Sequence, residues 1–186
     1  MKTLIVVDAQ NDFMPGGSLP VAEGDKIVPE INELIKGLGR TLDLVVFTMD
    51  WHPPKHCSFK ENGGIWPVHC VMGTKGAELH NDLLVNSDDR IIIKGNDLNV
   101  DSYSAFYDNE RKHKTELTDF LKSKGAKNII ICGLATDYCV KFTVLDAISE
   151  GFRVALYTMG CRGVNINPGD ADKAIKEMKD AGATII

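Results

Sequence analysis

The chain has 186 residues, of which 44% are hydrophobic and 25% charged, and its formal net charge is −5. This length and composition are typical of a single globular domain over residues 1–186, and they exclude a disordered chain. Acidic and basic residues are mixed along the sequence, so there is no electrostatic reason to expect nucleic acid or an anionic membrane as a partner.

The N-terminal segment and the cysteines indicate the compartment. The first apolar run is too short for a signal peptide, and no apolar stretch approaches the length of a membrane span. An odd number of cysteines in a chain of this size favours reduced thiols, at Cys57, Cys70, Cys132, Cys139 and Cys161. We therefore expect a cytoplasmic protein. The sequence leaves the oligomeric state open, and a homo-oligomer is compatible with it.

In the first half of the chain, short apolar runs alternate with one amphipathic segment and long loops. Residues 4–7 form a continuous apolar run, as expected for a strand buried on both faces of a parallel sheet. The elements predicted next are, in order, a loop over 9–25, a helix over 27–38 ending near Gly37 and Gly39, a strand over 42–48, a loop over 53–75 and a strand over 90–94.

The second half repeats this alternation. It predicts a loop over 96–108, a helix over about 110–123, a strand over 128–133, a helix with Thr136 as its cap that ends at Gly151, a strand over 152–158, a helix opened by Asn167 and Pro168, and a strand over 184–186. Alternating strands and helices indicate an α/β fold with a parallel sheet. No G-x-G-x-x-G or phosphate-loop motif is present, so a nucleotide cofactor is not indicated.

Reactive side chains follow three of the predicted strands. Asp8 and Lys94 come directly at strand ends, and Cys139 lies one turn beyond another strand, at the start of a helix. Because parallel strands place their carboxyl ends at one edge, we expect the three to converge. A carboxylate, a cation and a thiol form a set suited to acyl transfer, with Asp8 moving the thiol proton and Lys94 stabilising the charges. The backbone N–H groups of Ala135 and Cys139 are candidates for an oxyanion hole.

A second group of polar residues suggests a metal site. Asp50 and His52 follow the strand predicted over 42–48, and His69 lies in the long loop after them. One carboxylate and two imidazoles suit Zn²⁺, Fe²⁺ or Mn²⁺, with further positions open to water or substrate. Either His56 or Glu61 is a candidate for a fourth protein ligand, and the sequence does not decide between them.

Motifs along most of the chain resemble one family. The sequence is similar to the nicotinamidase branch of the isochorismatase-like cysteine hydrolases. The matching stretches are V-D-A-Q-N-D-F from Val7, T-M-D-W-H-P from Thr48, W-P-V-H-C-V from Trp66, Lys94-Gly95, Y-S-A-F from Tyr103 and G-L-A-T-D-Y-C-V from Gly133. The combination of D-W-H-P with W-P-x-H-C distinguishes this branch from isochorismatases and from ureido or carbamoyl hydrolases.

The resemblance implies roles for these residues. Asp8, Lys94 and Cys139 would be the catalytic triad, and one divalent ion would be bound by Asp50, His52 and His69. The resemblance further implies that the ion holds the pyridine nitrogen of nicotinamide, that the Leu134–Ala135 peptide is cis, and that the ring is enclosed by Phe13, Trp66 and Tyr103. The fold of the family is a three-layer α/β/α sandwich with a six-stranded, mainly parallel sheet.

These observations predict a metal-dependent amidohydrolase that converts nicotinamide to nicotinate and ammonia in NAD salvage, and that also accepts pyrazinamide. One alternative is another amide or ureido hydrolase of the same superfamily. A second is a metal-binding or redox-sensing protein without hydrolase activity. A structural zinc site built from His56, Cys57, His69 and Cys70 is a competing interpretation of the loop, although its spacing matches no zinc motif.

Overall fold

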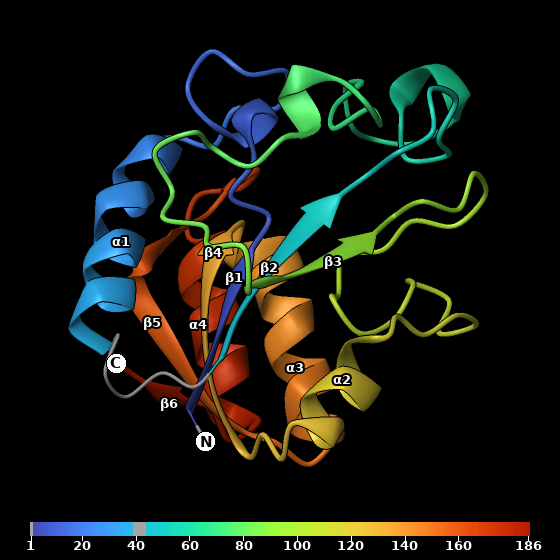
Figure 1. Ribbon diagram of the computed structural model, residues 1–186. Coiled ribbons are helices and arrows are strands. Elements are labelled where there is room, and N and C mark those ends of the chain that lie inside the picture. Colours follow the sequence, from blue (N-terminus) through green and yellow to red (C-terminus); the bar gives the residue numbers. More distant parts are fainter. Residues whose placement is uncertain (1, 39–43) are drawn as a thin grey trace.

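A computed structural model describes residues 2–38 and 44–186 (Figure 1). The strands are β1 (Lys2–Val7), β2 (Leu44–Asp50), β3 (Arg90–Lys94), β4 (Asn128–Leu134), β5 (Arg153–Arg162) and β6 (Thr184–Ile185). The α-helices are α1 (Ile27–Leu38), α2 (Leu117–Ser123), α3 (Lys141–Ser149) and α4 (Asp170–Asp180). A π-helix over Thr136–Val140 precedes α3, and short 3-10 helices interrupt the long loops at Asn11–Phe13, Gly24–Lys26, Lys60–Asn62 and Lys75–Ala77.

Among the described residues, six strands form one sheet in the order β3-β2-β1-β4-β5-β6. Every pair of neighbouring strands is parallel. Helix α1 lies on one side of the sheet, and α2, α3 and α4 lie on the other (Figure 1). The predicted three-layer α/β/α fold with a six-stranded parallel sheet is confirmed.

The central strands carry the core. Residues 4–7 of β1 are fully buried, as the continuous apolar run predicts, because helices cover both faces of the sheet. The order of the strands places β1 between β2 and β4, and the carboxyl ends of all three point to the edge where the long loops gather (Figure 1). Ligands of parallel α/β sheets bind beyond the carboxyl ends of the strands, so this edge is where we expect a binding site.

Helix α2 is shorter than the predicted helix over 110–123. The first half of the predicted helix is wrong. The Asp108 carboxylate instead accepts hydrogen bonds from the backbone N–H groups of Lys112 at 2.9 Å and His113 at 2.7 Å. These bonds hold residues 108–113 in a turn, in which Arg111 has a positive φ of 55°. A side chain that competes for backbone donors delays the helix.

Other boundaries differ by a few residues. Asn167 does not cap the last helix, since Gly169 with a φ of 86° occupies the cap position and α4 starts after it. Strand β5 extends to Arg162 because its ladder with β4 resumes past an irregularity, at the pair Gly133 and Cys161. The predicted end of α1 at Gly39 and the first two residues of the predicted strand over 42–48 lie outside the described residues.

Within residues 2–38 and 44–186, we find no helix with the length and apolar character needed to span a membrane. All five cysteines are free thiols.

Candidate active site

The structure brings Asp8, Lys94 and Cys139 together at the carboxyl edge of the sheet. The ammonium group of Lys94 lies 2.8 Å from Oδ2 of Asp8 and 3.4 Å from Sγ of Cys139. All three side chains are buried, with Asp8 fully inaccessible. They come from the end of β1, the end of β3 and the turn after β4, so the convergence follows from the parallel order of these strands.

Thr48 fixes the orientation of the Asp8 carboxylate. The Thr48 hydroxyl donates to Oδ1 of Asp8 at 2.5 Å and accepts the backbone N–H of Asp8 at 3.1 Å. Asp8 has a positive φ of 45°, which turns the chain sharply away from β1. One carboxylate oxygen is thus bound by Thr48, and the other faces Lys94.

Burial governs the proton distribution around the nucleophile. Burial raises the pKa of the Cys139 thiol well above its ordinary value, although the Lys94 ammonium opposes this rise. The position at a helix start therefore does not by itself produce a thiolate. Burial also raises the pKa of Asp8, against the effect of Lys94. Cys139 thus needs a base to remove its proton. Asp8 is a candidate for that base, because both side chains lie beside the ammonium group of Lys94.

Cys139, the candidate nucleophile, lies on an unusual turn. The Leu134–Ala135 peptide is cis, as the resemblance implies, and the carbonyl of Ala135 accepts the N–H of Tyr138 at 3.0 Å and of Val140 at 3.1 Å. The second bond closes the wider turn of a π-helix. The prediction that Thr136 caps this helix is wrong, since Ala135 occupies that position and no side chain makes a cap hydrogen bond.

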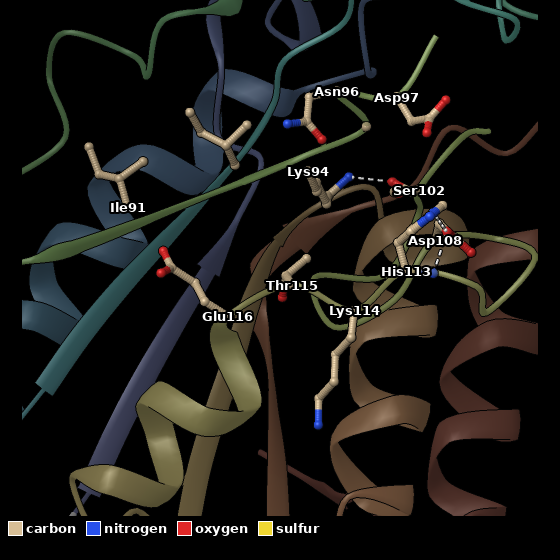
Figure 2. Close-up of a pocket in the computed structure, with 12 residues that line it drawn as sticks. Ile91, Lys94, Asn96, Asp97, Ser102, Asp108, His113, Lys114, Thr115 and Glu116 are labelled. Carbon is tan, nitrogen blue, oxygen red and sulfur yellow. Dashed lines mark hydrogen bonds and ion pairs between the residues drawn. The ribbon is translucent and has the colours of Figure 1, made fainter. Parts of the chain in front are cut away.

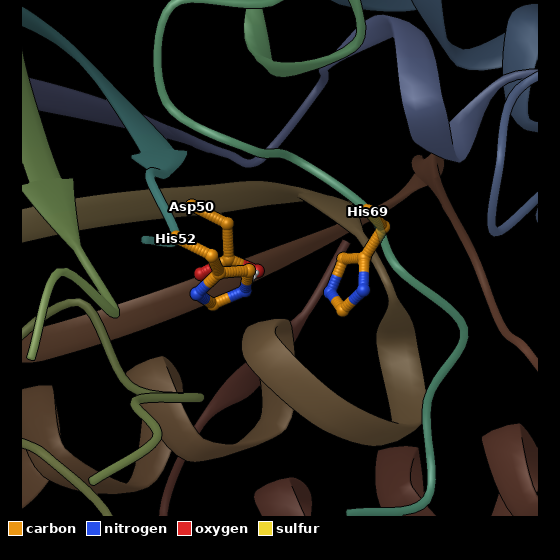
Figure 3. Close-up of side chains that lie close together, drawn as sticks. All are labelled: Asp50, His52 and His69. Atoms are coloured by element: carbon orange, nitrogen blue, oxygen red, sulfur yellow. Dashed lines mark ion pairs between the residues drawn. The ribbon is translucent and has the colours of Figure 1, made fainter. Parts of the chain in front are cut away.

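Asp50, His52 and His69 form a compact cluster (Figure 3). One ligand atom from each residue lies within 4.8 Å of the others, and all three side chains are buried. Nδ1 of His52 faces the carbonyl of Gly95 at 2.7 Å, and Nδ1 of His69 faces the carbonyl of Pro67 at 2.8 Å. Because a carbonyl only accepts, each Nδ1 carries the proton, and each Nε2 keeps a lone pair for a ligand.

This donor set fits a divalent metal ion. Burial alone would raise the pKa of Asp50, but Lys94 and His52 hold it well below its ordinary value, so the carboxylate is ionised. One anionic oxygen and two neutral imidazole nitrogens are ligands that first-row divalent ions accept. Lys94 donates to Oδ1 of Asp50 at 2.5 Å, which leaves the other carboxylate oxygen facing His52 at 3.7 Å.

The two candidates for a fourth ligand lie outside this cluster. His56 is buried and stacks on His52, with ring centroids 4.0 Å apart and 20° between the planes. His56 forms, with His52 and Asp101, a second group of possible ligand atoms that lie within 4.8 Å of one another. Glu61 is exposed on the short helix Lys60–Asn62. The choice of a fourth protein ligand stays a prediction.

The structural zinc site has no support among the described residues. The groups of ligand atoms that cluster there include neither Cys57 nor Cys70. Burial raises the pKa of the Cys70 thiol well above its ordinary value, which disfavours the thiolate that zinc requires.

A small apolar pocket connects the two groups of polar residues. It is lined by Asp50 and His69 from the metal cluster, by Cys139, and by aromatic side chains. The three aromatic residues predicted as ring walls all line it, and Nε1 of Trp66 donates to the Tyr103 hydroxyl at 3.1 Å. Phe13 lies beside His69, with ring centroids 5.6 Å apart. The pocket therefore offers a nucleophile and an ion site to one flat ligand.

A second cleft lies on the other side of Lys94, along the exposed edge of β3 (Figure 2). Its walls carry mixed charges, including Asp108 and His113, which hydrogen bond to each other. Cys139 does not line this cleft. We therefore place the chemistry in the apolar pocket.

Sequence reasoning missed several residues of the site. Tyr138 packs edge-on against Trp66 at 4.9 Å and Tyr103 at 5.4 Å, so it completes the aromatic wall. Its position next to Cys139 was the only available signal. Thr48 and Ser102 also contact the triad, the latter through its carbonyl, which accepts from Lys94 at 2.9 Å.

Comparisons with known proteins show what the whole chain is similar to. Residues 2–186 match the Isochorismatase domain family. The chain is 45% identical to the nicotinamidase of Escherichia coli (strain K12), over 99% of this chain and 93% of that protein. It is also similar to the pyrazinamidase of Pyrococcus horikoshii in complex with zinc, with a TM-score of 0.91, 45% identity and coverage of 100% and 98% of the two chains. PnC1 from L. infantum in complex with nicotinate gives a TM-score of 0.94 at 40% identity, covering 100% of this chain and 92% of that one.

Proposed function

The chain belongs to the isochorismatase family and is a hydrolase acting on amides, and from this premise we propose that it converts nicotinamide to nicotinate and ammonia. The observation that carries the proposal is the shared pocket, which is lined by Cys139 and by the metal-ligating residues Asp50 and His69. A flat pyridine ring held at the ion would present its carboxamide to the thiol.

The residues of the chain divide the reaction between them. Asp8 accepts the Sγ proton as Cys139 attacks the carboxamide carbon, and Lys94 stabilises the negative charge that develops beside it. The backbone N–H groups of Ala135 and Cys139 bind the oxyanion. Asp8 then donates its proton to the departing nitrogen, which leaves ammonia and a thioester on Cys139. Water, deprotonated by Asp8, hydrolyses the thioester and restores the thiol.

The bound ion would be zinc, iron or manganese, coordinated by Asp50, His52 and His69. When bound, it supplies a Lewis acid that accepts the ring nitrogen and orients the substrate. Phe13, Trp66 and Tyr103 enclose the ring and exclude water. Pyrazinamide, which replaces one ring carbon by nitrogen, fits the same contacts.

The proposal includes the cellular setting. Residues 1–186 act as one domain in the cytoplasm and serve NAD salvage. The five free thiols support this location, because reduced cysteines are the rule in that compartment.

Ammonia release from nicotinamide tests the proposal. We expect turnover by the metal-loaded protein and a loss of roughly 10⁴-fold or more in Cys139→Ala, because the nucleophile is removed. Cys57→Ala is the matched control, since Cys57 lies outside the pocket, and it should keep full activity. Turnover of a ureido or carbamoyl substrate in place of nicotinamide would overturn the substrate assignment, and an active Cys139→Ala would overturn the mechanism.

A further inference from the structure

The segment directly after Asp8 contributes no ligand to the metal cluster. It contacts both parts of the chain that do, namely the end of β2 at Asp50 and the loop at His69. We propose that Gln10 and Asp12 are positioning residues that hold the metal ligands Asp50 and His69 at their spacing. The inference rests on the metal site of the proposed function and extends it to residues outside the ligand set.

Gln10 holds the main chain of Asp50. Its amide is fully buried, and its Oε1 accepts the backbone N–H of Asp50 at 2.8 Å. Its Nε2 donates to the carbonyl of Asp50 at 2.7 Å and to the carbonyl of Ala77 at 2.7 Å. Both amide hydrogens and the amide oxygen are thus used, so the side chain has a single orientation. It fixes the peptide groups on both sides of the Asp50 side chain, just where β2 ends.

Asp12 holds the residue after His69. Its carboxylate is buried, and Oδ2 accepts the backbone N–H of Cys70 at 2.7 Å. The carbonyl of Cys70 in turn accepts the N–H of His52 at 2.9 Å. Cys70 is therefore bound from both ends, with a positive φ of 45°. Asp12 thus fixes the peptide group between His69 and Cys70, and the carbonyl of Cys70 in turn holds the main chain of His52.

The surrounding chain leaves the Asp12 carboxylate little freedom. A Cβ atom at Gly76 would lie 2.2 Å from Oδ2 of Asp12, so only glycine permits this approach. Oδ1 accepts the N–H of Ser18 at 3.2 Å, which gives each oxygen its own backbone donor. A buried carboxylate with a fixed partner for each oxygen is a rigid support for the loop that carries His69.

The order along the chain explains why one segment has this role. Asp8 moves the proton, and Gln10 and Asp12 follow it on the same short stretch before Phe13 reaches the pocket wall. The position of the ion is thereby tied to the position of the acid–base carboxylate. Supporting partners of metal ligands typically change metal affinity by about 10- to 100-fold when they are removed.

The test compares metal affinity in Gln10→Met, Asp12→Asn and Asn11→Ala. Asn11 is the matched control, because its amide donates only to the carbonyl of Lys75, at 2.8 Å, in the same pair of loops. Affinity for Zn²⁺ is measured by competition with a chelating dye, and the ligand field is read from the visible spectrum of the Co²⁺ form. We expect Gln10→Met and Asp12→Asn to weaken affinity about 10- to 100-fold and to alter the Co²⁺ spectrum, with Asn11→Ala unchanged.

Affinities within about 2-fold of wild type and an unaltered Co²⁺ spectrum would overturn the proposal, as would an equal loss in Asn11→Ala. If one variant fails to fold by circular dichroism, the other decides. Unchanged variants beside a wild type that binds metal and hydrolyses nicotinamide would overturn only the positioning role. A wild type that binds metal but releases no ammonia would overturn the proposed function and leave the positioning role standing.

Discussion

Lys94 is the residue on which the electrostatics of the site depend. Its ammonium group lies within 2.8 Å of the carboxylates of both Asp8 and Asp50, and it is almost completely buried. Burial alone would lower the pKa of Lys94, but the two carboxylates hold it well above its ordinary value. One cation thus contacts both the proposed proton-transfer residue and a proposed metal ligand, which couples the two halves of the site.

Thr48→Val tests the control of the Asp8 pKa. The hydrogen bond from Thr48 lowers the pKa of Asp8 and so opposes the rise caused by burial. Activity requires ionised Asp8, so kcat/KM falls as the pH drops through this pKa. In Thr48→Val the pKa rises further, and we expect the acidic limb of the profile to move to higher pH, with a loss of about 10- to 100-fold at pH values on the acidic side of that limb. An acidic limb that stays in place would exclude Asp8 as the group observed.

Sequence patterns find residues at strand ends more easily than residues that act across loops. Asp8 and Lys94 were identified because parallel strands end at one edge, whatever the side-chain packing. Gln10 contacts residues 40 and 67 positions away, and Asp12 contacts Cys70, 58 positions away, so no local pattern indicates these contacts. Their positions inside a glycine- and proline-containing stretch are equally typical of ordinary loop residues.

At the level of elements, the contact between β1 and β4 sets the distance between Asp8 and Cys139, the proposed base and nucleophile. Gly133 pairs with Val7 and has a φ of 123°, and a Cβ atom there would lie 2.0 Å from the carbonyl oxygen of Val7. The two backbones can approach closely only because this residue is glycine. Asp8 and the turn to Cys139 begin directly after this pair.

We therefore expect Gly133→Ala to force β1 and β4 apart. It should reduce the free energy of unfolding by at least about 3 kcal/mol and abolish most amidase activity. Gly125→Ala is the matched control, since Gly125 also has a positive φ, of 74°, but has no atom within 4 Å of an added Cβ. Urea unfolding should show a loss of only about 1–2 kcal/mol for the control. Equal losses in both variants would mean that φ alone, and not the close approach, requires glycine at position 133.

Glu150 connects the end of α3 with two neighbouring segments. Its carboxylate accepts a hydrogen bond from the Tyr107 hydroxyl, and it pairs with Lys122 of α2 at 3.0 Å and with Lys114 at 3.8 Å. The Tyr107 hydrogen bond, followed by the two lysines, holds the pKa of Glu150 below its ordinary value despite burial. A lowered carboxylate pKa contributes stability that is present above about pH 4.3 and is lost as the pH falls through the folded-state pKa.

Glu150→Gln should accordingly lower the free energy of unfolding by about 1–2 kcal/mol at pH 7. The difference from wild type should shrink as the pH falls below about 4, where the unfolded and then the folded carboxyl group become protonated. Glu110→Gln, which removes an exposed pair with Lys112, should change stability by less than about 0.5 kcal/mol. A difference between Glu150→Gln and wild type that does not depend on pH would show that packing, not charge, holds these segments.

The succession of strands and helices was predictable because its signals are local. Apolar runs and amphipathic periods mark each buried element, and parallel pairing follows from their alternation. The start of α2 was not predictable. The Asp108 carboxylate accepts backbone N–H groups that a longer helix would use, and it reaches them only once the turn has folded. The residue types around Thr136 likewise do not specify the π-helix before α3, whose wide turn is closed by the bond from the N–H of Val140 to the carbonyl of Ala135.

At the scale of the whole molecule, the metal site links the sheet to its longest loop. Asp50 and His52 come from the end of β2 and the residues just after it, whereas His69 lies in the long loop that also contains buried Phe59 and exposed Ile65. The ring of Phe59 packs edge-on against His52 at 5.7 Å and His69 at 5.5 Å. Without the ion, ring contacts and backbone hydrogen bonds still join the two parts of the cluster, among them the bonds from the N–H of His52 to the carbonyl of Cys70 and from the N–H of Met72 to the carbonyl of His52, each 2.9 Å long.

Removal of the metal should therefore loosen the loop before it unfolds the sheet. An ion present at 100 times its dissociation constant stabilises the folded state by about 2.7 kcal/mol, so a chelator should lower the unfolding temperature of the wild type. Limited proteolysis should then cut near exposed Ile65 while β1 and β4 stay intact. In Asp50→Asn, whose metal affinity is reduced from the start, the chelator should change neither the unfolding temperature nor the cleavage pattern. The same chelator-induced change in that variant would place the stabilising ion elsewhere, because Asp50 contributes the one carboxylate of the cluster Asp50, His52 and His69.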